Sequence, residues 1–147
     1  MHIVAILINN ELNTTKRTAV IKSKGRVLAS KGMNKSSGKV FFRVLGGGID
    51  FGETSAEALK REFKEELNAA IINEVLLCTA ENIFEYNGEQ GHEITFLYEA
   101  DFQEEHLYHE VSMPILDNNA ATAEWVPISD VLSGAVILYP TEAIQYL

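Results

Sequence analysis

Residues 46–69 constrain the fold of this chain more tightly than any other stretch. Three consecutive glycines at 46–48 precede Thr54, and Glu57 stands three residues after that threonine. A threonine followed at this spacing by a glutamate is a capping box, in which the two residues satisfy each other's free backbone N–H groups at the start of a helix. Residues 55–67 are mostly good helix formers. The sequence therefore predicts a glycine-rich turn that leads into a helix over residues 55–67.

The predicted helix is amphipathic, and a cluster of acids lies beside its apolar side. Glu62, Glu65 and Glu66 share a neighbouring face through spacings of three and four residues. Carboxylates this close repel one another unless a cation lies among them. An acidic helix face is most often simply solvated, but its place beside the core and after the glycines favours a site that holds Mg²⁺ against a phosphate chain. The apolar stripe consists of Ala56, Leu59, Phe63 and Leu67.

This stretch resembles the Nudix box, G-x5-E-x7-R-E-U-x-E-E-x-G-U, where U is a bulky aliphatic residue. Asn68 stands where the family usually has glycine, and asparagine is the next most tolerant residue at a left-handed helix C-cap. Residues 17–48 and 123–128 also resemble the opening strands and a late strand of the family, so the likeness covers most of the chain. The residues that match the box are Gly47, Glu53, Arg61, Glu62, Glu65 and Glu66. Asn68, Phe63 and Ala69 occupy the remaining positions with less usual residues.

The resemblance implies a Mg²⁺-dependent hydrolase, with Mn²⁺ as a substitute, that cleaves a pyrophosphate bond in a nucleoside diphosphate linked to another moiety. Nucleoside triphosphates, ADP-ribose, dinucleoside polyphosphates and nucleotide sugars all stay open as substrates. The alternative is a non-catalytic nucleotide or ADP-ribose sensor on the same fold, which has no need of the full acid set. The resemblance assigns the metal to Glu62, Glu65, Glu66 and the carbonyl of Gly46, and it gives structural roles to Gly47 and to an ion pair between Glu53 and Arg61.

The general base and the substrate contacts are less sharply defined. Glu93 begins a predicted strand in a family-like position, and we include it among the catalytic candidates. Arg43, Phe84 and Tyr86 are candidates for binding the substrate, since an aromatic ring can stack on a nucleobase, although core packing is the favoured role for each aromatic. The acids considered as base are Glu62, Glu93, Glu104, Glu105 and Glu110.

Composition indicates a single enzyme domain over residues 1–147. The chain is 46% hydrophobic and 22% charged, with a net charge of −9. Because surfaces that bind nucleic acid are normally basic, we expect a small nucleotide partner and no general nucleic-acid binding. No apolar run is long enough to span a membrane, and the single Cys78 excludes an internal disulfide and fits a reducing cytoplasm. Family members often dimerise, so a homodimer stays open.

The remaining pattern predicts an α/β fold, and the resemblance implies an α/β/α sandwich with a mixed sheet. Polar loops are predicted at 33–39 and 103–121, a helical turn after Pro127 and a C-terminal helix over 141–147. Strands are predicted at 3–9, 18–21, 26–29, 40–45, 71–84 (with a bend), 93–102 and 123–126.

Overall fold

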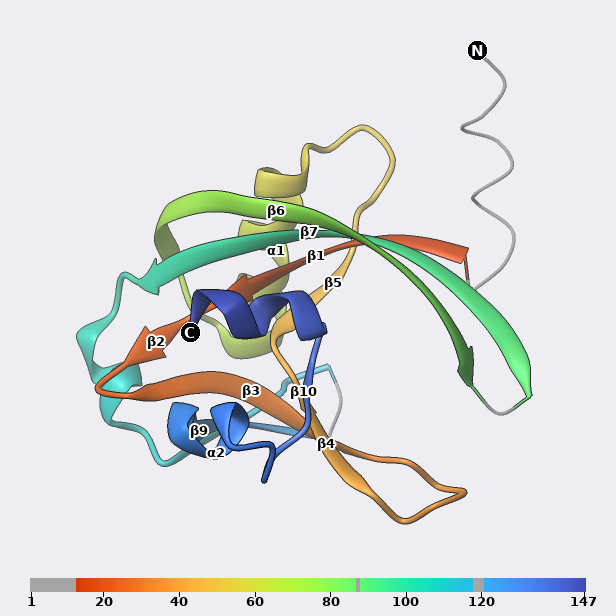
Figure 1. The fold of residues 1–147 in the computed structure, drawn as a ribbon. Coiled ribbons are helices and arrows are strands. Elements are labelled where there is room, and N and C mark those ends of the chain that lie inside the picture. The colour runs from red at the N-terminus through yellow and green to blue at the C-terminus, as the bar shows by residue number, and fades with distance from the viewer. Residues whose placement is uncertain (1–12, 87, 118–120) are drawn as a thin grey trace.

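The computed structural model describes residues 13–86, 88–117 and 121–147. These residues form two β-sheets with helices packed on both faces (Figure 1). The strand predicted at 3–9 lies outside the described residues. Among those residues, no helix is long and apolar enough to cross a membrane.

The first sheet is mixed, with the strand order β5-β1-β7-β6. β1 (Asn13–Val20) is central and pairs antiparallel with β5 (Leu45–Gly48) and parallel with β7 (Glu89–Phe102). β6 (Ile71–Tyr86) pairs antiparallel with β7 along a long hairpin. Two shifts of register in β6 produce the bend that the sequence predicted, since extra residues in one strand of a pair curve it.

The second sheet has the order β10-β4-β3-β9-β8, with β2 paired to β3. Its β3–β4 hairpin extends beyond the body of the molecule, on the same side of the view as the β6–β7 hairpin (Figure 1). The strands are β2 (Lys22–Ser23), β3 (Arg26–Met33), β4 (Val40–Arg43), β8 (Ser112–Pro114), β9 (Thr122–Pro127) and β10 (Leu138–Tyr139).

Side chains alternate across the strands and divide the core into two clusters. On β1, Ala19 packs in one cluster with Leu59 and Phe63 of α1 (Ser55–Leu67). Its neighbour Val20 points to the other face and packs in the second cluster, with residues of α2 (Ile128–Leu132) and η2 (Thr141–Tyr146). Helices therefore cover both faces of the strands, which confirms the predicted α/β/α arrangement.

Helix α1 has the bounds that the sequence predicted. The Glu57 N–H donates to Thr54 Oγ1 at 3.2 Å, and the Thr54 N–H donates to Glu57 Oε2 at 2.8 Å, which completes the capping box. At the other end, Asn68 adopts a left-handed conformation with φ 51° and ψ 36°. The Ala69 N–H then donates to the carbonyl of Phe63 at 3.2 Å, so the asparagine ends the helix as the family's glycine would.

The glycines do not form the predicted turn. Residues 46–48 belong to strand β5, and the turn follows at residues 51–52, where Gly52 has a φ of +90°. The lack of a side chain is needed for close approach to β1, because a Cβ on Gly46 would overlap the carbonyl oxygen of Arg17. Periodicity cannot separate these cases, since glycine permits both a turn and a tightly packed strand.

Three further segments differ from the sequence-based prediction. β1 begins at Asn13, well before the predicted start at Thr18. The segment predicted as a polar loop at 103–121 contains the 3-10 helix η1 (Glu105–His109) and strand β8. The C-terminal helix is present as the 3-10 helix η2. Short 3-10 turns and two- or three-residue strands depend on tertiary pairing, so they leave little periodic signal in the sequence.

The contrast between Gly46 and Gly48 yields a stability prediction. We expect Gly46→Ala to destabilise the fold by about 1–3 kcal/mol, because the methyl group must push β5 away from β1. A Cβ on Gly48 meets no atom within 4 Å, so Gly48→Ala should stay within about 0.5 kcal/mol of wild type. Denaturant unfolding of both variants measures the difference. Equal stability of the two variants would contradict the close-packing account of β5.

Candidate metal centre

Three acids meet at the C-terminal half of α1. Glu62 and Glu66 come from the helix and Asp117 from the segment after β8, and one carboxylate oxygen of each lies within 4.8 Å of the others. The Leu116 N–H donates to the carbonyl of Glu66 at 2.8 Å and thereby fixes the segment against the helix end. Asp117 was not among the sequence candidates, because nothing in its local sequence indicates that the chain returns to α1 at this point.

Arg17 holds Glu62 from inside the protein. Its side chain is fully buried, and Nη2 lies 3.0 Å from Glu62 Oε1 in an ion pair and donates to the carbonyl of Ala58 at 3.1 Å. Burial lowers the pKa of Arg17 to about 10, so the guanidinium stays charged at neutral pH. Its Nε and Nη1 atoms have no hydrogen-bond partner among the described residues. The sequence analysis missed this residue, although its alternation with Ala19 and Ile21 of the apolar run was a visible signal.

Gly47 lies directly beneath this ion pair. A Cβ built on Gly47 would stand 2.9 Å from Nη1 of Arg17 and 3.0 Å from Cδ of Glu62. A side chain here would therefore displace both charged groups. The glycine that the motif requires at this position gives the Arg17–Glu62 pair its space.

Arg61 binds several acids on the solvent side of the helix. It makes a two-pronged ion pair with Glu53, with Nε to Oε2 at 3.0 Å and Nη2 to Oε1 at 2.6 Å, so the predicted contact is present. Nη1 also donates to Glu65 at 3.2 Å and Nη2 to the carbonyl of Gly48 at 3.3 Å. The hydrogen bonds from Arg61 lower the pKa of Glu53 to about 2, and Glu53 in turn raises that of Arg61.

Glu65 accordingly lies apart from the three clustered acids. Its side chain is 54% exposed and bonded to Arg61, four residues earlier on the helix. Glu62 and Glu66 share a different face, rotated by one residue, about 100°. The structure thus places Asp117, rather than Glu65, beside the other two acids.

Glu62 is the one acid of the cluster that forms an ion pair among the described residues, so Glu66 has none of its own. Burial and the nearby Asp117 raise its pKa to about 7, and Arg17 only partly offsets this effect. Burial and the neighbouring acid together favour the neutral form of this carboxyl. An all-oxygen donor set of this kind fits Mg²⁺ or Mn²⁺.

Glu93 lies on the opposite face of the first sheet. Its carboxylate pairs with Lys16 at 3.0 Å and accepts a hydrogen bond from Thr95 at 2.8 Å. Lys16 alternates with Arg17, which points toward α1, so the Lys16–Glu93 pair points away from that helix. The structure does not bring Glu93 to the clustered acids.

The loop acids considered as base also lie elsewhere. The Glu104 carboxylate accepts the backbone N–H of Ala70 at 3.2 Å, which gives this acid a structural contact. Glu105 and Glu110 are exposed and stand outside the clustered acids. Of the five candidates, only Glu62 belongs to the cluster.

The predicted substrate contacts lie on both hairpins. Arg43 on β4 is exposed, with its guanidinium 5.1 Å from the centre of the Phe41 ring. Phe84 on β6 is 38% exposed and covers Gly91 on the paired strand. Tyr86 ends β6, and its side chain is outside the described set. Gly46 pairs with Thr18 in the sheet, one residue before the glycine under Glu62.

The fold and the site define an α/β/α sandwich with a carboxylate cluster on the helix that follows its glycine strand. The chain belongs to the NUDIX family, because the model of the NUDIX domain matches residues 14–144. No curated protein sequence matches the chain.

Solved structures show the same fold. A MutT NUDIX hydrolase from Burkholderia pseudomallei is 25% identical, with a TM-score of 0.60, over 79% of this chain and 84% of that one. A NUDIX hydrolase from Nitrosomonas europaea is 17% identical, with a TM-score of 0.64, over 90% and 84% of the two chains. A MutT protein from Bacillus halodurans is 18% identical, with a TM-score of 0.60, over 90% and 78%.

The Glu53–Arg61 pair yields a pH-dependent stability prediction. Because the pKa of Glu53 falls from 4.5 to about 2 on folding, its stabilising effect is present above the higher value and lost as pH falls toward the lower one. We expect Glu53→Gln to melt a few degrees below wild type near neutral pH and to approach wild type in acid. Glu65→Gln, at an exposed position with a single Arg61 contact, should melt like wild type throughout. If the difference in melting temperature between Glu53→Gln and wild type does not decrease in acid, the stabilising role assigned to the Glu53–Arg61 pair is wrong.

The raised pKa of Glu66 predicts the opposite trend. On folding, this pKa rises from 4.5 to about 7, so its contribution to stability is intact below the lower value and is lost as pH rises through the higher one. In the presence of chelator, we expect Glu66→Gln to gain melting temperature relative to wild type between about pH 5 and pH 8. Thermal melts across that range measure the gain, and a pH-independent difference would refute it.

Proposed function

We propose that this protein hydrolyses a pyrophosphate bond in a nucleoside diphosphate linked to another moiety, using Mg²⁺ or Mn²⁺. The observation that carries the proposal is the cluster that Glu62 and Glu66 of helix α1 form with Asp117 in a NUDIX fold. Crowded, partly buried carboxylates cost free energy in an isolated protein. A cation that binds phosphate oxygens at the same time relieves that cost and recruits the substrate.

The reaction consumes one water molecule. The water oxygen bonds to one phosphorus, the bridging P–O bond breaks, and the leaving phosphate takes the electron pair while a proton passes to a base. A bound divalent cation would neutralise phosphate charge and lower the pKa of a coordinated water. Glu62 is our candidate for the base, because it is the only one of the five acids considered as base that lies in the cluster. The ion pair with Arg17 fixes its orientation.

Other residues support the site without joining the cluster. Arg61 braces the turn before α1 through Glu53 and the carbonyl of Gly48. Glu65, which the motif assigns to the metal, lies at the exposed rim beside Arg61. Arg43 remains our candidate for a phosphate or base contact, because its charge is exposed beside an aromatic ring.

The direct test is a nucleotide panel assayed with Mg²⁺, with chelator, and with chelator followed by excess Mg²⁺. We expect phosphate-containing products in the first and third conditions alone. Glu66→Gln should abolish turnover while the fold is kept, and Asp117→Asn should raise the Mg²⁺ concentration needed for half-maximal rate. Glu89→Gln, an exposed acid in β7 outside the cluster, is the matched control.

Turnover in excess chelator, or a Glu66→Gln variant with wild-type kcat, would refute the metal assignment. Tight nucleotide binding without turnover of any panel member would favour the sensor alternative. Melting curves for each variant separate loss of chemistry from loss of fold.

A further inference from the structure

Strand β6 forms the outer edge of the first sheet. It pairs with β7 along one side, and no other described strand pairs with its second side (Figure 1). An edge strand offers free backbone N–H and C=O groups to a further strand, and native proteins usually protect it with lysine, proline or a bulge. The two register shifts of β6 lie between Ile72 and Cys78, and the strand contains neither lysine nor proline. Residues 78–85 are therefore a regular, unprotected edge.

The side of this edge that faces α1 carries acids. Thr79 is in register with Phe96, which packs against the core cluster of α1. Every second residue from Thr79 therefore lies on the same side, namely Glu81, Ile83 and Glu85. Ile83 is 71% exposed, and the side chain of Glu81 is 66% exposed. This side presents two carboxylates around an exposed apolar side chain.

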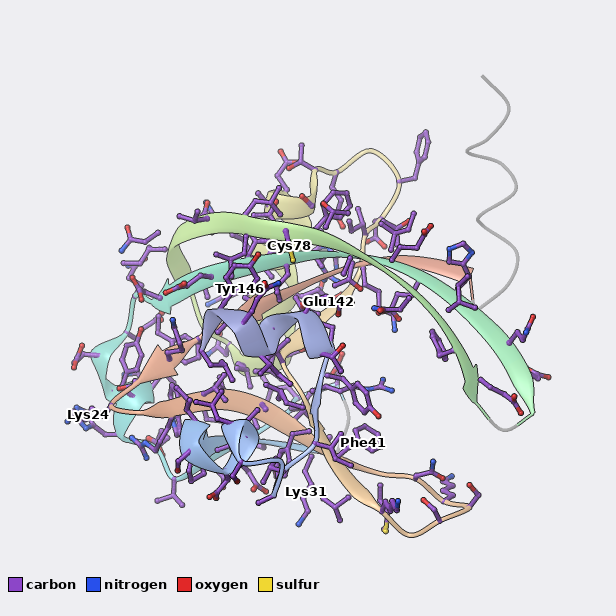
Figure 2. The ribbon with its side chains drawn as sticks, in the orientation of Figure 1. Lys24, Lys31, Phe41, Cys78, Glu142 and Tyr146 are labelled. Atoms are coloured by element: carbon purple, nitrogen blue, oxygen red, sulfur yellow. The ribbon has the colours of Figure 1, made fainter. Side chains whose placement is uncertain are left out.

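The other side of the edge is uncharged. Cys78 is in register with Leu97 of the second core cluster, so it lies on the side that η2 covers. Figure 2 shows Cys78 near Tyr146 of η2, whose hydroxyl donates to the carbonyl of Leu77 at 3.3 Å. The residues of the edge on this side are Cys78, Ala80, Asn82 and Phe84. A strand added along β6 thus meets carboxylates on one face and uncharged side chains on the other.

The charge of this edge determines what can pair with it. No lysine or arginine follows Lys64 in the sequence, so β6 and β7 contain no cation of their own. Among the described residues, Glu81 forms an ion pair only with His92, at 3.1 Å. A second copy of β6 would bring its own glutamates to this edge, and like charges directly opposite destabilise a strand pair. Charge complementarity therefore favours a segment that carries lysine or arginine.

A hollow at the start of β6 has the same complementarity. It has a volume of about 300 Å³ and is lined by Asn73, Val75, Leu77, Glu99, Ala100 and Asp101. Glu99 contacts Lys22 at 3.5 Å, whereas Asp101 accepts a hydrogen bond from Asn73 and forms no ion pair within the described part of the chain. Lysine and arginine place an aliphatic stem on apolar surface and keep the charged head outside it. Apolar walls beside a carboxylate therefore fit one long cationic side chain.

We propose that β6 is a docking edge for an extended segment of another protein, in which lysine or arginine alternates with apolar residues. The segment adds to the sheet as an antiparallel strand, with its cations beside Glu81 and Glu85 and one further basic side chain in the hollow. In this mode of recognition, main-chain hydrogen bonds give affinity and alternate side chains give specificity. The inference is independent of the proposed hydrolase function, because β6 contributes no residue to the clustered acids.

The direct test uses a dye-labelled peptide of about ten residues in which valine and lysine alternate. Binding is followed by fluorescence anisotropy. We expect Glu81→Gln combined with Glu85→Gln to weaken binding about tenfold, because two cross-strand charge pairs are lost. The matched control combines Glu105→Gln with Glu110→Gln, which removes two exposed acids outside β6, and should stay within about twofold of wild type.

Two further measurements separate strand addition from a general attraction between charges. Glu81→Lys combined with Glu85→Lys should bind a peptide of alternating valine and glutamate and lose the valine–lysine peptide. N-methylation of alternate residues removes the backbone donors from one edge of a peptide. Of two peptides methylated at the valines or at the lysines, we expect one to lose binding and the other to keep it.

The hollow has a test of its own. The peptide is extended by one arginine at either end, in two versions, and each is compared with a version that carries glutamine there. We expect one arginine peptide to bind more tightly than its glutamine version, and Asp101→Asn to remove that gain. Hydrogen exchange on the wild-type complex should slow most over residues 78–85.

The proposal is overturned if the valine–lysine peptide does not bind, if the control variant loses as much binding, or if both methylated peptides bind like the parent. Slower exchange over α1 in place of residues 78–85 would assign the peptide to the clustered acids and overturn it as well. It also fails if sedimentation shows self-association that Ile83→Lys abolishes, because a second copy then occupies the edge. None of these measurements requires turnover, so their outcome is separate from that of the hydrolase proposal.

Discussion

The buried ion pair between Arg17 and Glu62 is the contact on which the rest of the structure depends. A fully buried guanidinium is tolerated only when it is paired, and here it meets Glu62 and the carbonyl of Ala58. Those bonds attach α1 to the central strand β1 and demand a glycine at position 47, because any side chain there would occupy the same space. One ion pair thus links strand β1 to helix α1 and requires the glycine at position 47.

Two arginines contact the acids of the helix and meet at Glu62. Arg17 pairs with Glu62 from the core, and Arg61 pairs with Glu53, Glu65 and Glu62 from the solvent side. Glu66 keeps no arginine partner, and Asp117 increases the negative charge around it. This negative charge is local, and a divalent cation would offset it. The stabilising Glu53–Arg61 pair and the acids of the proposed metal site therefore both involve helix α1.

The placement of charge also links the two sheets. Cations concentrate in the strands before the glycines, and carboxylates concentrate from α1 onward. The two regions meet at β5, where the chain passes from the second sheet to the first.

The sequence by itself determined what depends on neighbouring residues. The bounds of α1 and its capping box follow from helix periodicity and local hydrogen bonds. The left-handed Asn68 and the Glu53–Arg61 contact, eight residues apart, were implied by the resemblance to the Nudix box. Only the tertiary structure decided that the glycines pair as a strand, that Asp117 returns to the helix end, and that Glu93 faces away from it. Those outcomes join segments distant in sequence, and their free energy comes from burial and strand pairing, which leave no fixed spacing in the chain.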